Sequence, residues 1–237
     1  MKRLKKQLEE LGFGGETLEQ KIQIFSRYRD LVLDWNTKVN LTAIKDPDEF
    51  ELKHFMDSVS CCMFPEVRKA EKIIDVGTGA GFPGIPLAIL FPEKEFVLLD
   101  SLNKRIKILQ EISEELNLYN VRPIHGRAED LARREEHREQ YDLCVSRAVA
   151  NLGVLAEYCL PFVKVGGWFG AYKTGNAEEE IRQSRQAIRI LGGKLETETT
   201  YNPDGMDFGH KILWIKKENQ TGKKFPRKAG TPQKEPL

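Results

Sequence analysis

Four glycines follow an apolar run in the segment "DVGTGAGFPGIPL", residues 75–87, and glycines at such spacing could bind a cofactor. Gly77, Gly79 and Gly81 read as G-x-G-x-G, whereas the later three, ending at Gly84, read as G-x-G-x-x-G. A glycine turn between a strand and a helix lets a ligand approach the main chain and meet free N–H groups at the helix start. The alternative is a tight turn that holds no ligand, since the pattern alone is weak. Its position directly after an apolar strand favours binding.

Three carboxylates near expected strand ends bear on the identity of that cofactor. Asp100 ends the next apolar run, about 20 residues past the glycines, where it could accept both ribose hydroxyls or simply cap a helix. Asp75 precedes the glycines, where it would repel a pyrophosphate but suit the cationic amino acid moiety of S-adenosylmethionine. Glu129 in "GRAEDL" could meet an adenine edge, although acids also favour helix N-termini. S-adenosylmethionine is therefore favoured over NAD, and an NAD-linked oxidoreductase is the alternative.

The choice of methyl acceptor is narrowed by side chains that the sequence lacks. Methylation of pyrimidine C5 needs a cysteine nucleophile, and no Pro-Cys pair occurs. Exocyclic amines are commonly held by an Asn/Asp-Pro-Pro-aromatic stretch, but the fourth expected strand ends in "SRAVAN". An acceptor atom that has a lone pair and no proton to remove needs alignment with the sulfonium methyl more than it needs a general base. The missing acid–base pair is consistent with such an acceptor.

Three further residues are candidates for contacting a substrate. Arg147 ends the fourth expected strand, at the sheet edge where ligands bind, although a salt bridge is the simpler interpretation. His54 and Lys173 are weaker candidates, because a lone histidine is more often structural. The sequence thus identifies no certain catalytic residue.

The elements that must position these residues follow an alternating pattern from residue 72 onward. Short apolar runs alternate with helical patterns, which predicts an α/β fold with a mostly parallel sheet covered on both faces. The last two runs are joined by "YNPDGMDFG" without a helix, which predicts an antiparallel hairpin at one sheet edge. The seven expected strands are "KIIDV", "EFVLLD", "VRPIH", "YDLCVS", "GWFGAYK", "GKLETET" and "HKILWIKK".

Two appendages flank this domain, which we place at residues 65–217. Residues 1–64 show apolar residues at helical spacing and predict a helical extension packed on the core, with Asp46 as a helix cap. Residues 218–237 form a basic tail with little to bury, which predicts disorder or order only on contact. Its "KKFPRKAGTPQK" stretch suits phosphate contact and one stacked base. Truncation after Lys217 should therefore weaken RNA affinity and spare cofactor binding.

Composition sets the broad class. The chain has 237 residues, 40% of them hydrophobic, and a net charge of +1, which suits one sizeable globular domain. No apolar run approaches the roughly 18 residues of a membrane span, and the start is unlike a secretory signal, so a cytoplasmic protein is expected. The four cysteines lack metal-like spacing and are expected to be reduced thiols, with no metal bound.

Seven segments together resemble the ribosomal RNA small subunit methyltransferase G family, also called glucose-inhibited division protein B. They are "WNTKVNLTAI", "HFMDS", "DVGTGAGFPGIPLAILFP", "LLDSLNKRIKIL", "GRAED", "SRAVANLGVL" and "FPRKAGTPQKEPL", and they span nearly the whole chain. The resemblance implies a Rossmann-like class I methyltransferase fold. It also implies transfer of a methyl group from S-adenosylmethionine to guanine N7 of 16S rRNA in the small ribosomal subunit, and we expect a monomer.

The resemblance also implies cofactor contacts at matched motif positions. These fall on Gly77 and Phe82 in the glycine loop, on Ala128 and Glu129 in "GRAED", and on Arg147. With an RNA substrate implied, His54, Arg147 and Lys173 are candidates for positioning it. A bidentate contact of Arg147 with guanine O6 and N7 would occupy the atom to be methylated, so Arg147 should contact the cofactor, a phosphate or O6. Two departures touch none of these contacts: asparagine 151 stands where proline is frequent, and phenylalanine 225 where tyrosine is frequent. A non-catalytic, ribosome-associated RNA-binding module is a third interpretation.

Overall fold

The computed structural model describes residues 1–147, 150–175, 178–202 and 209–237. Its centre is a seven-stranded sheet with the strand order β3-β2-β1-β4-β5-β7-β6. The strands are β1 Lys72–Val76, β2 Glu95–Asp100, β3 Val121–His125, β4 Tyr141–Arg147, β5 Val163–Thr174, β6 Gly193–Tyr201 and β7 His210–Lys217. Neighbours from β3 to β5 pair in parallel, whereas β7 runs antiparallel to both β5 and β6. This confirms the mostly parallel sheet with an antiparallel edge hairpin.

The apolar runs located the strands well. Four of the seven expected strands coincide with β1, β2, β3 and β7, while β5 begins four residues before the expected "GWFGAYK". The pairing of β4 with β5 shifts register between Tyr141 and Leu143, and the early part of β5 departs from regular alternation, with residues 164–166 exposed. Most of the segment that joins β6 to β7, residues 203–208, lies outside the described residues.

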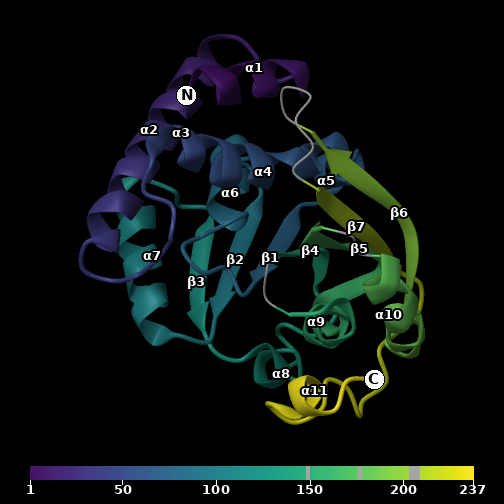
Figure 1. Ribbon diagram of the computed structural model, residues 1–237. Coiled ribbons are helices and arrows are strands. Elements are labelled where there is room, and N and C mark those ends of the chain that lie inside the picture. Colours follow the sequence, from purple (N-terminus) through teal and green to yellow (C-terminus); the bar gives the residue numbers. More distant parts are fainter. Residues whose placement is uncertain (148–149, 176–177, 203–208) are drawn as a thin grey trace.

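Alternating side chains on the strands meet different helices on the two faces. Ile73, Phe96 and Leu98 belong to one hydrophobic cluster, and their neighbours Ile74 and Val97 belong to the other. Helices that precede β3 pack on the first face and those that follow it pack on the second (Figure 1). The first group is α1 Lys2–Glu10, α2 Glu16–Asn36, α3 Pro47–Phe50, a π-helical turn Glu51–Met56, α4 Asp57–Val59, a 3-10 turn Ser60–Met63, α5 Glu66–Lys69, α6 Gly84–Leu90 and α7 Asn103–Glu115. The second is α8 Ala128–Leu131, α9 Leu152–Cys159, a 3-10 turn Leu160–Phe162, α10 Glu178–Ile190 and α11 Thr231–Lys234.

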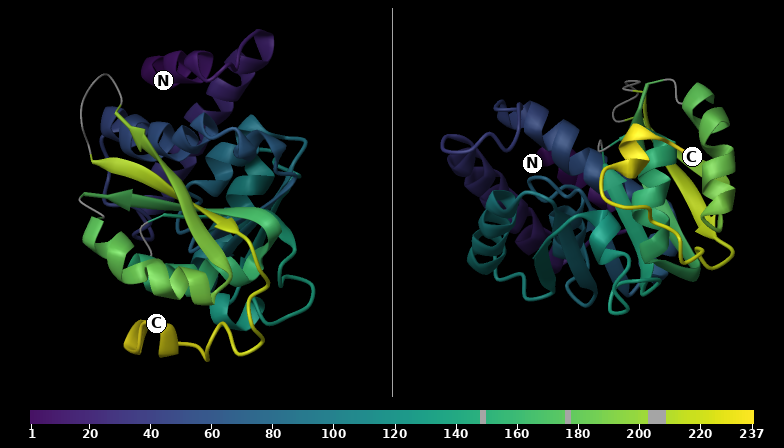
Figure 2. Two further views of the ribbon diagram at one scale, coloured as in Figure 1. Left: turned by 90° about the vertical axis from the view of Figure 1, so that its right-hand side faces the viewer. Right: turned by 90° about the horizontal axis from the view of Figure 1, so that it is seen from below.

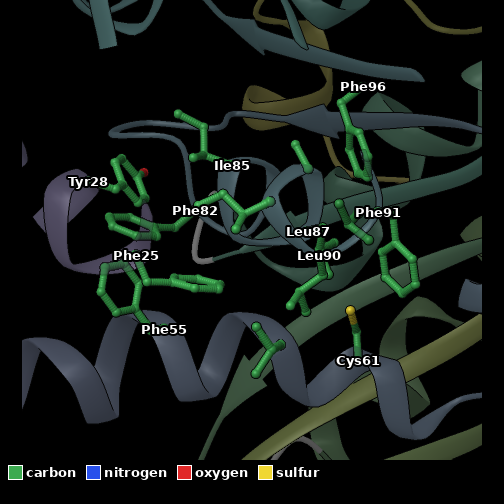
Figure 3. Packing of buried hydrophobic residues seen from close by; sticks show 14 of the residues in the cluster. Phe25, Tyr28, Phe55, Cys61, Phe82, Ile85, Leu87, Leu90, Phe91 and Phe96 are labelled. Atoms are coloured by element: carbon green, nitrogen blue, oxygen red, sulfur yellow. The ribbon is translucent and has the colours of Figure 1, made fainter. Parts of the chain in front are cut away.

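The N-terminal helices share a continuous core with the sheet domain. Phe25 and Tyr28 of α2 and Phe55 of the π-helical turn pack around Phe82, which follows the glycine loop (Figure 3). The Tyr28 hydroxyl donates a 2.7 Å hydrogen bond to the carbonyl of Ala80 within that loop. The helical extension therefore supports the loop directly. The domain boundaries at residues 64 and 217 stay a prediction.

The basic tail is ordered against the body of the protein, which corrects the expectation of disorder. Phe225 is buried, and the Arg138 guanidinium donates to the carbonyl oxygens of Phe225 and Thr221 at 2.9 and 2.6 Å. Arg227 pairs with the buried carboxylate of Glu157, at 2.6 Å from Nη2 to Oε2. Figure 2 shows this segment ending beside the helices of the second face, far from the N-terminus. Composition could not predict that the tail is ordered, because its partners Arg138 and Glu157 are distant in sequence.

Two compositional features can be compared with the structure. The four cysteines, at positions 61, 62, 144 and 159, are buried and free. Within the residues that the structure describes, none of the helices combines the length and apolar character needed to cross a membrane.

Candidate functional site

A cavity of about 480 Å³ opens at the carboxyl ends of β1, β2 and β4. The glycine loop forms one side of it, where Gly77 and Gly79 adopt φ angles of +75° and +62° that favour glycine. The cofactor cleft, as we call it, is lined by Leu41, His54, Gly77, Thr78, Gly79, Ala80, Phe82, Asp100, Ser101, Leu102, Arg105 and Arg147. Five predicted cofactor residues are thus brought together here.

The loop differs from an open cradle of backbone amides. The N–H groups of Gly77 and Thr78 donate to the carbonyl of Leu99, and that of Gly79 donates to Asp100 Oδ2 at 3.0 Å. The glycines therefore allow a ligand to approach the chain closely, but these three amides already have partners. The expectation of free N–H groups is corrected for them.

Gly81 has a packing role that the pattern did not reveal. A Cβ at Gly81 would lie 2.6 Å from the Tyr28 hydroxyl and 2.7 Å from Ile85 Cδ1. Gly84 is similarly crowded, by Leu98 and Asp75. Neither glycine lines the cofactor cleft. The predicted cofactor contact of Gly81 stays a prediction, while tight packing explains why a glycine stands there.

Asp75 is buried at the end of β1 and only partly satisfied. Its Oδ2 accepts hydrogen bonds from the Thr78 hydroxyl at 2.7 Å and from Gly84 N–H at 2.9 Å. Its Oδ1 has no partner within the described parts of the chain. Burial raises the pKa of Asp75 to about 6, against the opposing effect of these two hydrogen bonds. An unpaired buried acceptor beside the glycine loop suits a cationic group of a ligand.

Asp100 stabilises the turn at the end of β2 and also lines the cofactor cleft. Its Oδ1 accepts from Leu102 N–H at 2.8 Å, as expected of a strand-end turn, while Oδ2 accepts from Gly79 N–H. Arg105 Nη1 lies 3.3 Å from Oδ2. The carboxylate therefore joins the end of β2 to the glycine loop, and it faces the space where a ribose was predicted.

Arg147 and His54 form a wall with Phe82. Arg147 Nη2 lies 3.1 Å from His54 Nδ1, and the His54 ring stacks on Phe82 with centroids 4.4 Å apart. Because arginine only donates, Nδ1 accepts, and the proton on Nε2 is donated to Thr42 Oγ1 at 2.7 Å. Burial, followed by the positive charge of Arg147, lowers the pKa of His54 to about 3. His54 is therefore a neutral ring at physiological pH.

Asp57 is a site residue that reasoning from single residues missed. It starts α4, one turn after His54 on the π-helical turn, and its Oδ2 accepts from Arg147 Nη1 at 2.9 Å. His210 Nδ1 donates to its Oδ1 at 2.9 Å. Burial opposes ionisation, but the hydrogen bond from His210 and the charge of Arg147 outweigh it and hold the pKa of Asp57 below its ordinary value. The "HFMDS" segment, which carries both His54 and Asp57, was the available signal.

A second cavity, of about 400 Å³, adjoins the cofactor cleft and shares His54 and Arg147 with it. We call it the acceptor cavity; its lining is Lys53, His54, Asp57, Arg147, Tyr172, Lys173, Thr174, Glu180 and His210. Lys173, predicted from its place at the end of β5, lies here and bonds Glu180 at 2.6 Å. The three RNA-positioning candidates thus meet in one place.

Comparison with known proteins identifies the family. The model of the rRNA small subunit methyltransferase G family matches residues 21–203. A relative from Alkaliphilus metalliredigens, called ribosomal RNA small subunit methyltransferase G, is 50% identical over 234 residues, covering 99% of this chain and 97% of its own. A relative of the same name from Acetivibrio thermocellus is 51% identical over 227 residues, covering 95% and 93%. This chain belongs to the rRNA small subunit methyltransferase G family. The predicted enzyme class, an S-adenosylmethionine-dependent rRNA methyltransferase, is thereby confirmed, and an NAD-linked oxidoreductase is not supported.

Solved structures agree on the fold. An O-methyltransferase from Bacillus cereus, in complex with S-adenosylhomocysteine, superposes with a TM-score of 0.56 at 18% identity, covering 81% of this chain and 91% of that one. The fibrillarin pre-rRNA processing protein of Methanococcus jannaschii gives 0.52 at 17% identity, covering 65% and 70%. The Rossmann-like class I methyltransferase fold is confirmed.

The "GRAED" residues lie beside the cofactor cleft but are not among the residues that line it. Gly126 N–H donates to the carbonyl of Asp100 at 3.1 Å, which places the start of this segment next to the cleft. Ala128 begins α8, and the buried Glu129 accepts from Gly230 N–H of the tail at 2.9 Å. Glu129 thus has a structural partner, and the cofactor contacts of Ala128 and Glu129 stay a prediction.

Proposed function

We propose that this protein transfers the methyl group of S-adenosylmethionine to N7 of a guanine in 16S rRNA of the small ribosomal subunit. The observation that carries the proposal is the pair of adjoining cavities that share Arg147 and His54. At the shared wall the His54 imidazole has a pKa of about 3, and its Nδ1 already accepts from Arg147. Such a wall suits an acceptor atom that has a lone pair and no proton to remove, as guanine N7 does.

The cofactor cleft fits S-adenosylmethionine, which when bound supplies an electrophilic methyl group on its sulfonium. The unpaired Oδ1 of Asp75 would accept from the ammonium of the amino acid moiety, although Asp75 itself lies just behind the loop. Asp100 would hold the ribose hydroxyls, with Gly79 and Phe82 bounding the space between. A neutral carboxyl could not bind an ammonium well, so cofactor affinity should fall below about pH 6, where Asp75 becomes protonated.

The most direct test maps modified guanines. RNA from cells with and without this protein is treated with borohydride and aniline, which cleaves at 7-methylguanosine. We expect one 16S rRNA cleavage site to disappear with the protein and to return when the purified enzyme methylates unmodified subunits with labelled cofactor. An unchanged cleavage pattern would contradict methylation at guanine N7, and no label transfer despite binding of S-adenosylhomocysteine would contradict the small subunit as the substrate. The alternative of a non-catalytic RNA-binding module is not supported by the family membership.

We further propose that the enzyme acts as a monomer in the cytoplasm, alongside its ribosomal substrate. The support is the sequence composition and the continuous burial of the core within one chain. Sedimentation equilibrium of the purified chain would test the monomer, and a dimer at micromolar concentration would contradict it.

A further inference from the structure

The acceptor cavity holds one ion pair whose hydrogen-bonding capacity is incompletely used. Lys173 at the end of β5 and Glu180 on α10 lie 2.6 Å apart, with side chains 10% and 27% exposed. Lys173 Nζ also donates to the carbonyl of Ala150 at 2.8 Å. An ammonium has three N–H donors, and two of them are used within the described residues, which leaves one donor for a ligand.

The carboxylate of Glu180 also keeps part of its capacity to accept hydrogen bonds. Its Oε1 accepts from both Lys173 Nζ and the N–H of Leu152. In the part of the chain that the structure describes, Oε2 accepts no hydrogen bond. The pair therefore offers the cavity a fixed donor and an adjacent acceptor.

The other carboxylate of the cavity has a partner on each of its oxygens. Asp57 accepts from His210 through Oδ1 and from Arg147 through Oδ2, and its side chain is buried. Of the two acids that line the cavity, Glu180 is the more exposed, and within the described residues it alone has an oxygen that accepts no hydrogen bond.

We propose that Lys173 and Glu180 read the Watson–Crick edge of the target guanine, an inference that rests on the proposed function. Lys173 donates to O6, and Glu180 accepts from N1–H with the 2-amino group close by. Adenine presents the reverse pattern, an amino group toward the ammonium and a lone pair toward the carboxylate, so both contacts become unfavourable. The pair therefore selects guanine over adenine, whose N7 is equally exposed.

The placement of Lys173 and Glu180 beside the wall that contains Arg147 suits the arrangement of atoms on the base. Arg147 and Lys173 end the neighbouring strands β4 and β5, and Glu180 on α10 contacts both Lys173 and the first residue of α9. On guanine, N7, O6 and N1 follow one another around the ring. With O6 at Lys173 and N1 at Glu180, N7 points to the wall shared with the cofactor cleft, where the methyl group must arrive.

The simpler interpretation is that the pair is structural. It would then only hold Ala150 and the first residue of α9, Leu152, against the end of β5 and α10. A structural tie and a base-reading pair make different predictions about selectivity. Loss of a tie lowers activity on any substrate equally, whereas loss of a reader changes the ratio between substrates.

The test measures kcat/KM on unmodified small subunits that carry guanine or adenine at the mapped target position. We expect the combined Lys173→Gln and Glu180→Gln variant to lose about 10- to 100-fold of the guanine preference. The matched control is Lys211→Gln with Glu198→Gln, an ion pair on β7 and β6 that lies 3.1 Å apart and does not line the cavity. The control should keep the wild-type ratio.

A second measurement needs no variant. Subunits with inosine at the target keep O6 and N1–H, whereas 2-aminopurine lacks O6 and presents a lone pair at N1. We expect the wild-type enzyme to use inosine within about 10-fold of guanine and to reject 2-aminopurine. Equal use of both analogues, or an unchanged guanine-to-adenine ratio in the folded double variant, would overturn the inference. Failure of the wild-type enzyme to methylate any guanine would instead overturn the proposed function.

Discussion

Burial keeps His54 and Asp75 neutral over pH ranges in which each would ordinarily be charged. The pKa of His54 falls to about 3 and that of Asp75 rises to about 6. For His54, neutrality has a geometric consequence, because only a neutral ring can accept from Arg147 through Nδ1 while donating to Thr42. The imidazole thus orients the arginine at the wall between the two cavities.

The lowered pKa of His54 predicts a loss of stability in mild acid. Unfolded His54 binds a proton below about pH 6.5, whereas the folded residue does not until about pH 3, so its contribution is complete above pH 6.5 and is lost as pH falls. Between about pH 7.5 and pH 5, the wild-type protein should lose about 2 kcal/mol more unfolding free energy than His54→Gln. Urea denaturation at both pH values measures this. Asp75 is present in both proteins, so its opposite contribution cancels, and equal losses would show that His54 titrates normally.

Gly79 permits a positive φ angle and also leaves space in the cofactor cleft. A matched pair of variants can separate these two effects. Gly79 has a φ of +62° and an added Cβ would meet no atom within 4 Å, so valine would strain the chain and extend into open space. Gly166, on β5, has a φ of +89° and is equally uncrowded, but it lies outside the cofactor cleft. Both valine variants should lose about 1–3 kcal/mol of stability. Only Gly79→Val should lose S-adenosylhomocysteine affinity, by more than about 10-fold in calorimetry, and normal affinity would contradict the assignment of the loop.

At the scale of elements, the tail and α9 are joined by an ion pair with one deeply buried member. Glu157 is 1% exposed, and it accepts from the Arg227 backbone N–H as well as from the guanidinium. Arg227→Met would leave this carboxylate without its charge partner, which we expect to cost about 3 kcal/mol in urea unfolding. Adding Glu157→Gln should restore most of the loss, because no buried charge then remains. A single variant as stable as the wild type would show that the tail is not anchored here.

The strands could be predicted from sequence because a parallel strand that is buried on both faces is a continuous run of apolar residues. Runs such as "KIIDV" are apolar on both faces, and the structure places β1 there. The order of the tail could not be predicted, because it depends on Arg138 and Glu157, which lie far from it in sequence. The same applies to Gly81, whose crowding by Tyr28 requires a helix that begins more than sixty residues earlier.

At the scale of the whole molecule, the site is assembled from both ends of the chain. The N-terminal helices contribute His54 and Asp57, the sheet contributes Arg147 and Lys173, and β7 contributes His210. Strand ends identified Arg147 and Lys173 in advance, because the carboxyl edge of a parallel sheet is fixed by topology. Asp57 and His210 were not predicted from physical reasoning, since their roles arise only when the helical extension packs against the sheet edge.

Electrostatic contact of the tail with RNA remains a whole-molecule prediction, with a changed mechanism. Phe225 is buried and therefore is not available to stack on a base in this conformation, but Lys223 and Lys224 are exposed. Truncation after Lys217 would also uncover Glu157, so point variants give the cleaner test.

Lys223→Ala with Lys224→Ala should weaken binding to small-subunit RNA and reduce the slope of log affinity against log salt by about 1.5, since each phosphate contact contributes roughly 0.7–0.9. The matched control is Lys2→Ala with Lys6→Ala on α1, which Figure 1 places at the opposite end of the molecule from the tail. Affinity for S-adenosylhomocysteine should not change in either variant, because none of the four lysines lines the cofactor cleft. If both pairs reduce the salt slope equally, the attraction is a property of the whole surface, and the tail has no special part in holding the RNA.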